Sequence, residues 1–210
     1  MINTIIFDIG NVLLDFDYMT HFRRLFDEET AQTIANISIR DLKVWQEMDR
    51  SVLSYEEAVN LVVQGAPHLE KEIRFAIDDL YNSIDSYPYS VDWVRSLKEK
   101  GYRVYILSNF GEKPFETCKP RMPFLQYVDG QVISYQVREV KPNPAIYQAL
   151  CNKFSIDPQE AVFIDDSAIN IAGAKDFGLH TILFTDYADA VAQLKALPLA
   201  YSHEIAITDI

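Results

Sequence analysis

Two short hydrophobic runs in this chain end in acidic residues. Residues 4–7 (TIIF) are followed by Asp8, and residues 161–164 (AVFI) are followed by the pair Asp165-Asp166. Continuous hydrophobic runs of this length are typical of strands that are buried on both faces of a parallel sheet. The pattern therefore predicts two buried strands with acidic side chains at their carboxyl ends, where open α/β sheets hold their active sites.

Between about residues 15 and 87 the pattern changes to hydrophobic residues spaced three or four apart, as in amphipathic helices. The spacing is clearest in residues 21–26, 42–48 and 55–62. Ser54 and Glu57 have the spacing of a capping box at the start of the last segment. We interpret residues 15–87 as an all-helical insertion.

Beyond residue 88, predicted helices and strands alternate. This alternation favours an α/β fold with a doubly wound parallel sheet. We expect two domains, a core made of residues 1–14 and 88–210 and a small helical cap made of residues 15–87. The tail at residues 201–210 gives no clear signal. The predicted helices cover 91–100, 144–154, 168–177 and 188–197, and the predicted strands cover 103–107, 131–134, 161–165 and 180–184.

The composition is that of an acidic globular protein. Of its 210 residues 49% are hydrophobic and 24% are charged, with a net charge of −12. No hydrophobic run approaches the roughly 20 residues that span a membrane, and residues 1–3 lead into a strand instead of a secretory signal. We therefore expect a cytoplasmic protein without membrane contact. Cys118 and Cys151 lack the spacing of a zinc site or a disulfide framework and are interpreted as ordinary thiols.

The net charge also indicates which classes of ligand the protein can bind. Nucleic-acid binding depends on basic side chains that neutralise phosphates, so a net charge of −12 argues against it. A small phosphorylated metabolite is compatible with this charge, because a metal ion and a few local cations set the potential inside a pocket.

The predicted strand ends bring complementary chemistry to one edge of the sheet. A carboxylate can attack phosphorus and form an acyl phosphate, and magnesium takes oxygen ligands from carboxylates and carbonyls. A lysine and a hydroxyl can stabilise charge on the oxygens being transferred. A general acid is the one component missing. The residues are Asp8, Gly10, Ser108, Asn109, Lys141, Asp165 and Asp166.

These residues resemble the four motifs of the haloacid dehalogenase (HAD) superfamily of aspartyl phosphatases, in order and over nearly the whole chain. The resemblance implies a Rossmann-like core with a helical cap inserted after the first motif, in agreement with the insertion at 15–87. It also implies a phosphoric monoester hydrolase that uses Mg²⁺. The motifs are residues 7–12 (FDIGNV), 107–109 (LSN), 141–142 (KP) and 163–166 (FIDD), the last followed by Asn170 and Gly173-Ala174.

The resemblance also implies roles for the individual residues. Asp8 is then the nucleophile, and Lys141 neutralises charge on the nucleophile and the phosphate. The phosphoryl group or the substrate is held by Ser108, Asn109 and Asn11, together with Lys141. Mg²⁺ is held by Asp8, the backbone carbonyl of Gly10 and Asp166, with Asp165 acting directly or through water.

Gly10 departs from the superfamily pattern. Most of its phosphatases have a second aspartate there, which protonates the leaving group and later activates water. Losing such a group typically removes a contribution of about 10²–10⁴-fold. The segment at residues 8–12, followed by Asp15-Phe16-Asp17, is similar to the bacterial alpha-D-glucose-1-phosphate phosphatases, a branch with the same glycine. An anomeric phosphate has a relatively good leaving group, which offers one explanation for Gly10.

We therefore expect a Mg²⁺-dependent phosphatase that acts on a small phosphorylated metabolite, with a sugar phosphate favoured and a hexose 1-phosphate the best single candidate. Three alternatives stay open. A 2-haloacid dehalogenase would use the same aspartate against carbon, although it has no need for paired acids that bind a cation. A phosphomutase would need the acid and base that Gly10 lacks. A non-catalytic phosphate-binding or partner-binding protein would have lost turnover with the second aspartate.

Other polar and aromatic residues in the insertion have structural interpretations. Asp15 and Asp17 fit the cap of a helix that begins near Tyr18, with a role for Asp17 at a hinge as the alternative. Three aromatic and sulfur-containing side chains fit a hydrophobic core stripe better than a substrate-binding surface. They are Trp45, Met48 and Tyr55.

Overall fold

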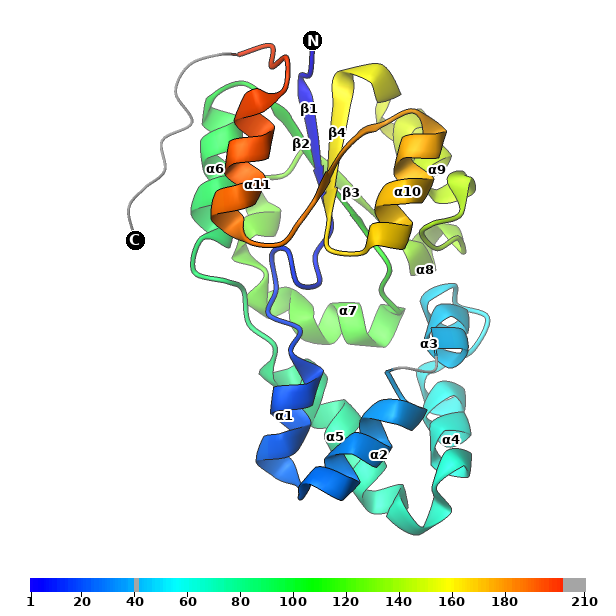
Figure 1. Ribbon diagram of the computed structural model, residues 1–210. Coiled ribbons are helices and arrows are strands. Elements are labelled where there is room, and N and C mark those ends of the chain that lie inside the picture. Colours follow the sequence, from blue (N-terminus) through cyan, green and yellow to red (C-terminus); the bar gives the residue numbers. More distant parts are fainter. Residues whose placement is uncertain (40–41, 202–210) are drawn as a thin grey trace.

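The computed structural model describes residues 1–39 and 42–201. Five parallel strands form one sheet in the order β3-β2-β1-β4-β5, with β1 at its centre (Figure 1). This confirms the predicted α/β class with a doubly wound parallel sheet. The strands are β1 (Thr4–Phe7), β2 (Arg103–Ser108), β3 (Gly130–Ile133), β4 (Ala161–Asp165) and β5 (His180–Leu183).

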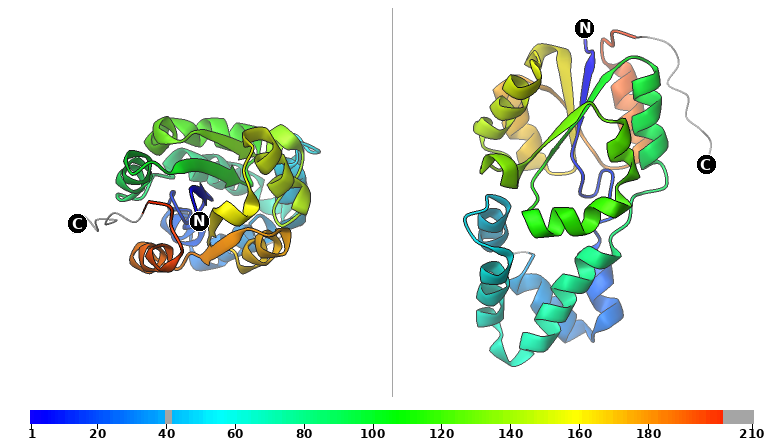
Figure 2. Two further views of the ribbon diagram at one scale, coloured as in Figure 1. Left: turned by 90° about the horizontal axis from the view of Figure 1, so that it is seen from above. Right: turned by 180° about the vertical axis from the view of Figure 1, so that it is seen from behind.

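Helices cover both faces of the sheet because its strands are hydrophobic on both sides. On one face, α6 (Ser90–Glu99) and α11 (Tyr187–Ala196) pack Trp93 and Val191 against a cluster that includes Phe7. On the other face, α9 (Pro144–Phe154) and α10 (Ala168–Phe177) pack against a cluster that includes Phe163. Figure 2 shows these two helical layers from above.

The remaining large helices gather at the carboxyl edge of the sheet and form the helical cap (Figure 1). The chain passes between core and cap twice, and these two segments pair through an antiparallel bridge of Leu14 with Ser86. The division at residues 15 and 87 itself stays a prediction. The cap helices are α1 (Tyr18–Leu25), α2 (Glu28–Ile37), α3 (Leu42–Asp49), α4 (Tyr55–Gly65) and α5 (Glu70–Ser83), with a 3₁₀ turn at Pro67–Leu69.

Local signals in the cap sequence have the predicted effect. Ser54 and Glu57 form a capping box at the start of α4, in which each side chain accepts from the other's backbone N–H. Asp17 caps α1 by accepting a hydrogen bond from the Thr20 backbone N–H. Both interactions satisfy amide groups that the first turn of a helix leaves without partners.

Several short elements of the core are additions to the predicted pattern. Prolines interrupt the hydrophobic periodicity between residues 112 and 127, so the sequence there does not indicate a helix. No helix within residues 1–39 and 42–201 combines the length and the apolar character needed to cross a membrane. The additions are α7 (Glu112–Cys118), α8 (Ser134–Val137) and 3₁₀ turns at Lys119–Arg121, Pro123–Tyr127 and Pro158–Glu160.

Candidate active site

The register of the sheet brings the predicted acidic residues to one edge. Phe7 at the end of β1 is paired with Ile106 of β2 and with Ile164 of β4. The next residues along these strands, Asp8 and Asp165 among them, therefore lie side by side where the strands open into loops. The strand pattern alone was sufficient to predict this arrangement.

Asp8 is fixed by donors on three sides. Its Oδ1 accepts hydrogen bonds from the Ser108 hydroxyl at 2.7 Å and from the Ile9 backbone N–H at 2.7 Å, and lies 2.8 Å from Lys141 Nζ. Burial raises the pKa of Asp8 to about 7, even though the nearby Lys141 charge opposes this shift. The side chain is thus a buried carboxylate in one fixed orientation, as a nucleophile requires.

Lys141 lies between two buried carboxylates. Its Nζ is 2.8 Å from Asp8 Oδ1 and 2.7 Å from Asp165 Oδ2, and the residue is only 2% exposed. Burial disfavours the ammonium charge, but the two carboxylates outweigh it and raise the pKa of Lys141. The site therefore holds a permanent cation beside the candidate nucleophile.

Asn109 contacts the backbone of Lys141. Its Oδ1 accepts from the Lys141 N–H at 2.8 Å, and its Nδ2 donates to the Lys141 carbonyl at 3.0 Å. Asn109 thus fixes the loop that carries the lysine. Its expected contact with the phosphoryl group stays a prediction.

Asp8, Asp165 and Asp166 form a cluster whose ligand oxygens all lie within 4.8 Å of one another. Mg²⁺ binds oxygen ligands octahedrally at 2.0–2.1 Å, so opposite ligands lie about 4.2 Å apart. Burial, opposed by the hydrogen bond from Asn11, raises the pKa of Asp166. A bound cation would remove the repulsion between these acids, so both the donor type and the spacing fit Mg²⁺.

The three acids differ in how much of their bonding capacity is already used. Asp165 accepts from Lys141, from the Ser167 N–H at 2.8 Å and from Asn170 Nδ2 at 3.1 Å. Asp166 accepts from Asn11 Nδ2 at 2.9 Å, which holds it beside the first loop. These contacts favour Asp8 and Asp166 as direct ligands, with Asp165 as the residue that supports the site through Lys141.

Gly10 lies in the wall of the cavity in front of Asp8. A Cβ built at this position would meet no atom within 4 Å. Packing therefore does not require glycine here, because the place where the superfamily has its second aspartate has room for a Cβ.

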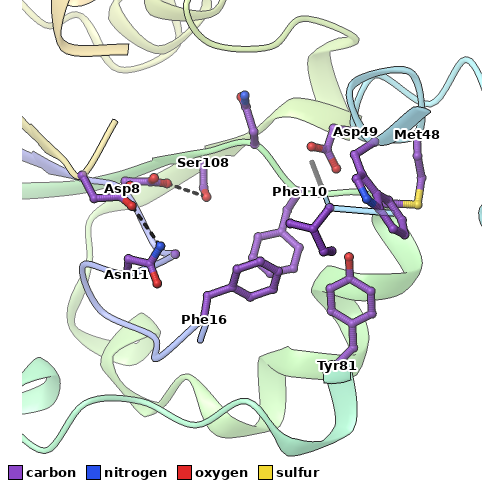
Figure 3. A pocket seen from close by; sticks show the side chains of 13 residues that line it. Asp8, Asn11, Phe16, Met48, Asp49, Tyr81, Ser108 and Phe110 are labelled. Atoms are coloured by element: carbon purple, nitrogen blue, oxygen red, sulfur yellow. Dashed lines mark hydrogen bonds between the residues drawn. The ribbon is translucent and has the colours of Figure 1, made fainter. Parts of the chain in front are cut away.

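A cavity of about 220 Å³ lies between the carboxyl edge of the sheet and the cap (Figure 3). Asp8 and Ser108 lie on one side of it, and Met48, Asp49 and Tyr81 lie on the other (Figure 3). Its walls also contain the predicted residues Gly10, Asn11, Asn109 and Asp166 and the hydrophobic residues Phe16, Ile39, Trp45 and Phe110. Lys141 and Asp165 are not in the wall, but Lys141 contacts Asp8 and so connects Asp165 to it.

The cap contributes site residues that sequence analysis missed or interpreted differently. Trp45 and Met48 are buried, as expected for a core stripe, and yet they also line the cavity. Asp49 and Tyr81 received no role from the sequence. The one available signal was that Asp49 follows the hydrophobic stripe of α3 directly. Asp17 lines a separate cavity with Asp15 and is not brought to the site.

Asp49 is the only acidic residue that the cap contributes to this cavity within the described part of the chain. Burial raises the pKa of Asp49 to about 7, with a smaller contribution from Asp8, while the Gly111 N–H and Lys141 oppose the shift. The cavity is therefore bordered by carboxyl groups from both the core and the cap.

A family model described as haloacid dehalogenase-like hydrolase matches residues 2–178. This match covers most of the 210 residues, so the chain belongs to the haloacid dehalogenase-like hydrolases. The assignment confirms the superfamily that the four motifs indicated and the prediction of a hydrolase.

Known relatives include both phosphatases and dehalogenases. D-ribitol-5-phosphate phosphatase of Bacteroides thetaiotaomicron is 27% identical over 209 residues, which cover 90% of this chain and 95% of that protein. An (S)-2-haloacid dehalogenase of Burkholderia cepacia is 28% identical over 117 residues, which cover 55% of this chain and 51% of that protein. These relatives do not confirm the predicted resemblance to glucose-1-phosphate phosphatases.

Solved structures agree with the fold. A HAD family enzyme of Bacteroides thetaiotaomicron, solved with magnesium and inorganic phosphate, superimposes with a TM-score of 0.68 at 26% identity, covering 87% of this chain and 93% of that chain. L-2-haloacid dehalogenase of Xanthobacter autotrophicus has a TM-score of 0.67 at 18% identity, covering 92% of this chain and 82% of that chain. The second likeness concerns the fold alone.

Proposed function

We propose that this protein is a Mg²⁺-dependent phosphatase that hydrolyses a small phosphorylated metabolite through an aspartyl phosphate on Asp8. The observation that carries the proposal is a buried carboxylate fixed by Ser108 and Lys141 beside two further acids with the spacing of a cation site. The phosphatase relative and the similar structure that contains magnesium and phosphate support it.

In the first step, an oxygen of Asp8 attacks phosphorus and the bond from phosphorus to the leaving oxygen breaks. Ser108 and Ile9 orient the carboxylate by their hydrogen bonds, so the reacting oxygen is in place before substrate arrives. Lys141 offsets negative charge beside the attacking oxygen. In the second step, water attacks the phosphorus of the aspartyl phosphate and releases inorganic phosphate.

Mg²⁺ would be held by Asp8, Asp166 and the carbonyl of Gly10, with Asp165 in support. When bound, it neutralises charge on the phosphoryl oxygens and helps to orient them. The rest of the catalytic apparatus belongs to the chain itself.

The cavity limits the size of the substrate. Pockets for drug-sized ligands are about 300–1,000 Å³, whereas this one is about 220 Å³ and must also hold the phosphoryl group. Its wall combines hydrophobic rings with the polar ends of Tyr81 and Asp49. A sugar or sugar-alcohol phosphate fits this description better than a nucleotide or a flavin, and a hexose 1-phosphate stays the first candidate from the sequence.

The direct test is phosphate release from a panel of sugar phosphates, sugar-alcohol phosphates, nucleotides and flavin mononucleotide, with and without Mg²⁺. We expect release from the smaller substrates only, lost with a chelator and lost in Asp8→Asn. Asn keeps the size of the side chain, so circular dichroism should show an unchanged fold. Wild-type rates in Asp8→Asn would exclude the covalent mechanism.

A 2-haloacid dehalogenase is the second candidate, because two relatives have that activity in their names. Attack on carbon needs no cation, whereas this site clusters three acids within 4.8 Å. Halide release from 2-chloropropionate that survives a chelator would favour the dehalogenase over the phosphatase.

A further inference from the structure

The missing second aspartate leaves the proposed reaction without a proton donor. Gly10 has room for a side chain but offers none. The leaving oxygen of an alkyl phosphate nevertheless needs a proton, and general acids typically contribute about 10²–10⁴-fold to the rate. The other acidic side chains of the cavity wall are the candidates for this donor.

Asp49 occupies the position that such a donor requires. In an in-line displacement the attacking and leaving oxygens lie on opposite sides of phosphorus. Asp8 borders the cavity from the core and Asp49 borders it from the cap, on the far side (Figure 3). A phosphoryl group attacked by Asp8 from the core, with its leaving oxygen toward the cap, would have Asp49 on the leaving side.

The carboxyl group is held where the cap contacts the core. The Gly111 backbone N–H at the start of α7 lies close enough to Asp49 to lower its pKa. Directly after Asp49, Arg50 Nε donates to the Arg138 carbonyl at 3.3 Å, and Ser51 Oγ donates to the Tyr135 carbonyl at 3.5 Å. These contacts join the end of α3 to the core and fix Asp49 over the cavity.

We propose that Asp49 is the general acid and base of this enzyme and replaces, from the cap, the aspartate that Gly10 lacks. This inference rests on the proposed phosphatase function. In the first step the Asp49 carboxyl gives its proton to the leaving oxygen as the bond to phosphorus breaks, and the alcohol departs. In the second step the Asp49 carboxylate takes a proton from water while the water oxygen attacks phosphorus and the bond to Asp8 breaks.

The electrostatic surroundings agree with this role. The charges that act on Asp49 are those of Asp8 and Lys141 from the core, and Tyr81 of α5 is close enough to sense its charge. Burial raises the pKa of Asp49 to about 7, so both its protonated and its ionised form are available near neutral pH, as a group that donates and then accepts a proton requires.

The nearby Gly111 N–H suggests a rival explanation, in which Asp49 only links cap and core. Asp49→Asn separates the two, because an amide oxygen can still accept from Gly111 but the side chain cannot donate an acidic proton. The rate of the first turnover should be measured with p-nitrophenyl phosphate, whose weakly basic leaving group needs no proton, and with the best alkyl phosphate of the panel. Glu47→Gln is the matched control, because Glu47 lies on the same helix and outside the cavity wall.

We expect Asp49→Asn to lower the alkyl phosphate rate about 10²–10⁴-fold and to leave the burst of p-nitrophenol nearly unchanged. After the burst, turnover of p-nitrophenyl phosphate should be slow and phosphorylated protein should accumulate. The ratio of the wild-type to the Asp49→Asn alkyl phosphate rate should fall above about pH 7, since both proteins keep Asp8, whose own pKa is also about 7. Glu47→Gln should behave as wild type. Recovery of the alkyl phosphate rate in Gly10→Asp/Asp49→Asn would add support.

Equal losses with both substrates would overturn the assignment and leave Asp49 as a link between cap and core. An unchanged alkyl phosphate rate would overturn it as well. A wild-type protein that gives neither a p-nitrophenol burst nor phosphate release would instead contradict the proposed function itself, and the inference would fall with it.

Discussion

At the scale of single residues, Lys141 has the most constrained surroundings in the site. It is buried between Asp8 and Asp165, with its backbone fixed by Asn109. Removing one partner of a buried ion pair leaves an uncompensated charge and costs about 3–5 kcal/mol. The residue is therefore important for folding as well as for the proposed chemistry.

For Lys141→Met we expect a free energy of unfolding lower by about 3–5 kcal/mol in a chelator. Saturating Mg²⁺ should restore part of this loss, because the cation also neutralises Asp8 and Asp166. Urea denaturation with and without Mg²⁺ measures both effects. A variant as stable as wild type in the chelator would show that the buried carboxylates do not depend on Lys141.

Asp49 gives a prediction for the pH dependence of stability. Its pKa is raised from 3.8 to about 7. The folded protein holds the Asp49 proton more tightly than the unfolded chain does. The resulting stability is fully present below pH 3.8 and is lost as the pH rises through about 7. The Asp49→Asn protein has no such loss. The free energy of unfolding of the variant minus that of wild type should therefore increase by about 1–3 kcal/mol from pH 5 to pH 8.

Urea denaturation of both proteins at the two pH values tests this expectation. Asp8 is retained in both proteins, so the comparison isolates Asp49. Parallel pH dependence in wild type and variant would mean that Asp49 is not buried as a neutral acid.

At the scale of elements, the sequence predicted best where start and stop signals are local. The helices Pro144–Phe154 and Ala168–Phe177 have the predicted bounds, since a proline begins the first and Gly178 ends the second in a left-handed conformation. The strand ends carrying Asp8 and Asp165 were predictable for the same reason.

Other elements depend on contacts distant in the sequence. Helix α7 contains Pro114, and its helical turns pack on α5 of the cap, which no local pattern indicates. Asp49 reaches the site because α3 is oriented by the rest of the cap. Its role could not be inferred from a motif, whereas the four motifs sufficed to indicate Asp8, Ser108, Lys141 and Asp166.

A change in the capping box of α4 should affect the stability of the protein without affecting the active site. Ser54→Ala removes one side of the box and should lower the free energy of unfolding by about 1 kcal/mol. Neither residue of the box borders the cavity, so kcat should change little. Urea denaturation together with steady-state assays measures both quantities, and a large loss of kcat would show that the start of α4 positions the site.

At the scale of the whole molecule, the site is divided between two parts of the chain. The core supplies the proposed nucleophile, the lysine and the acidic cluster, and the cap closes the cavity with Asp49, Tyr81 and hydrophobic rings. Water is excluded and the proposed acid is in place only when cap and core meet. Under the proposed mechanism, a core without a second aspartate obtains its general acid from the cap.

Metal binding should stabilise this assembly. A cation that binds the folded chain and not the unfolded one raises the free energy of unfolding by about 2.7 kcal/mol at a hundredfold excess over its Kd. We expect Mg²⁺ to raise the Tm of wild type and to have a smaller effect on Asp166→Asn. Thermal denaturation over a Mg²⁺ titration tests this, and equal shifts in the two proteins would exclude Asp166 as a ligand.

The central claim is that Asp8 carries the phosphoryl group during turnover. The most direct measurement is the mass of the protein quenched with acid while it turns over its best substrate, followed by identification of the modified peptide. We predict a species heavier by one phosphoryl group on Asp8, enriched in Asp49→Asn and absent in Asp8→Asn. Turnover without any phosphorylated protein in wild type and in Asp49→Asn would contradict this mechanism. A phosphoryl group on a residue other than Asp8 would contradict it as well.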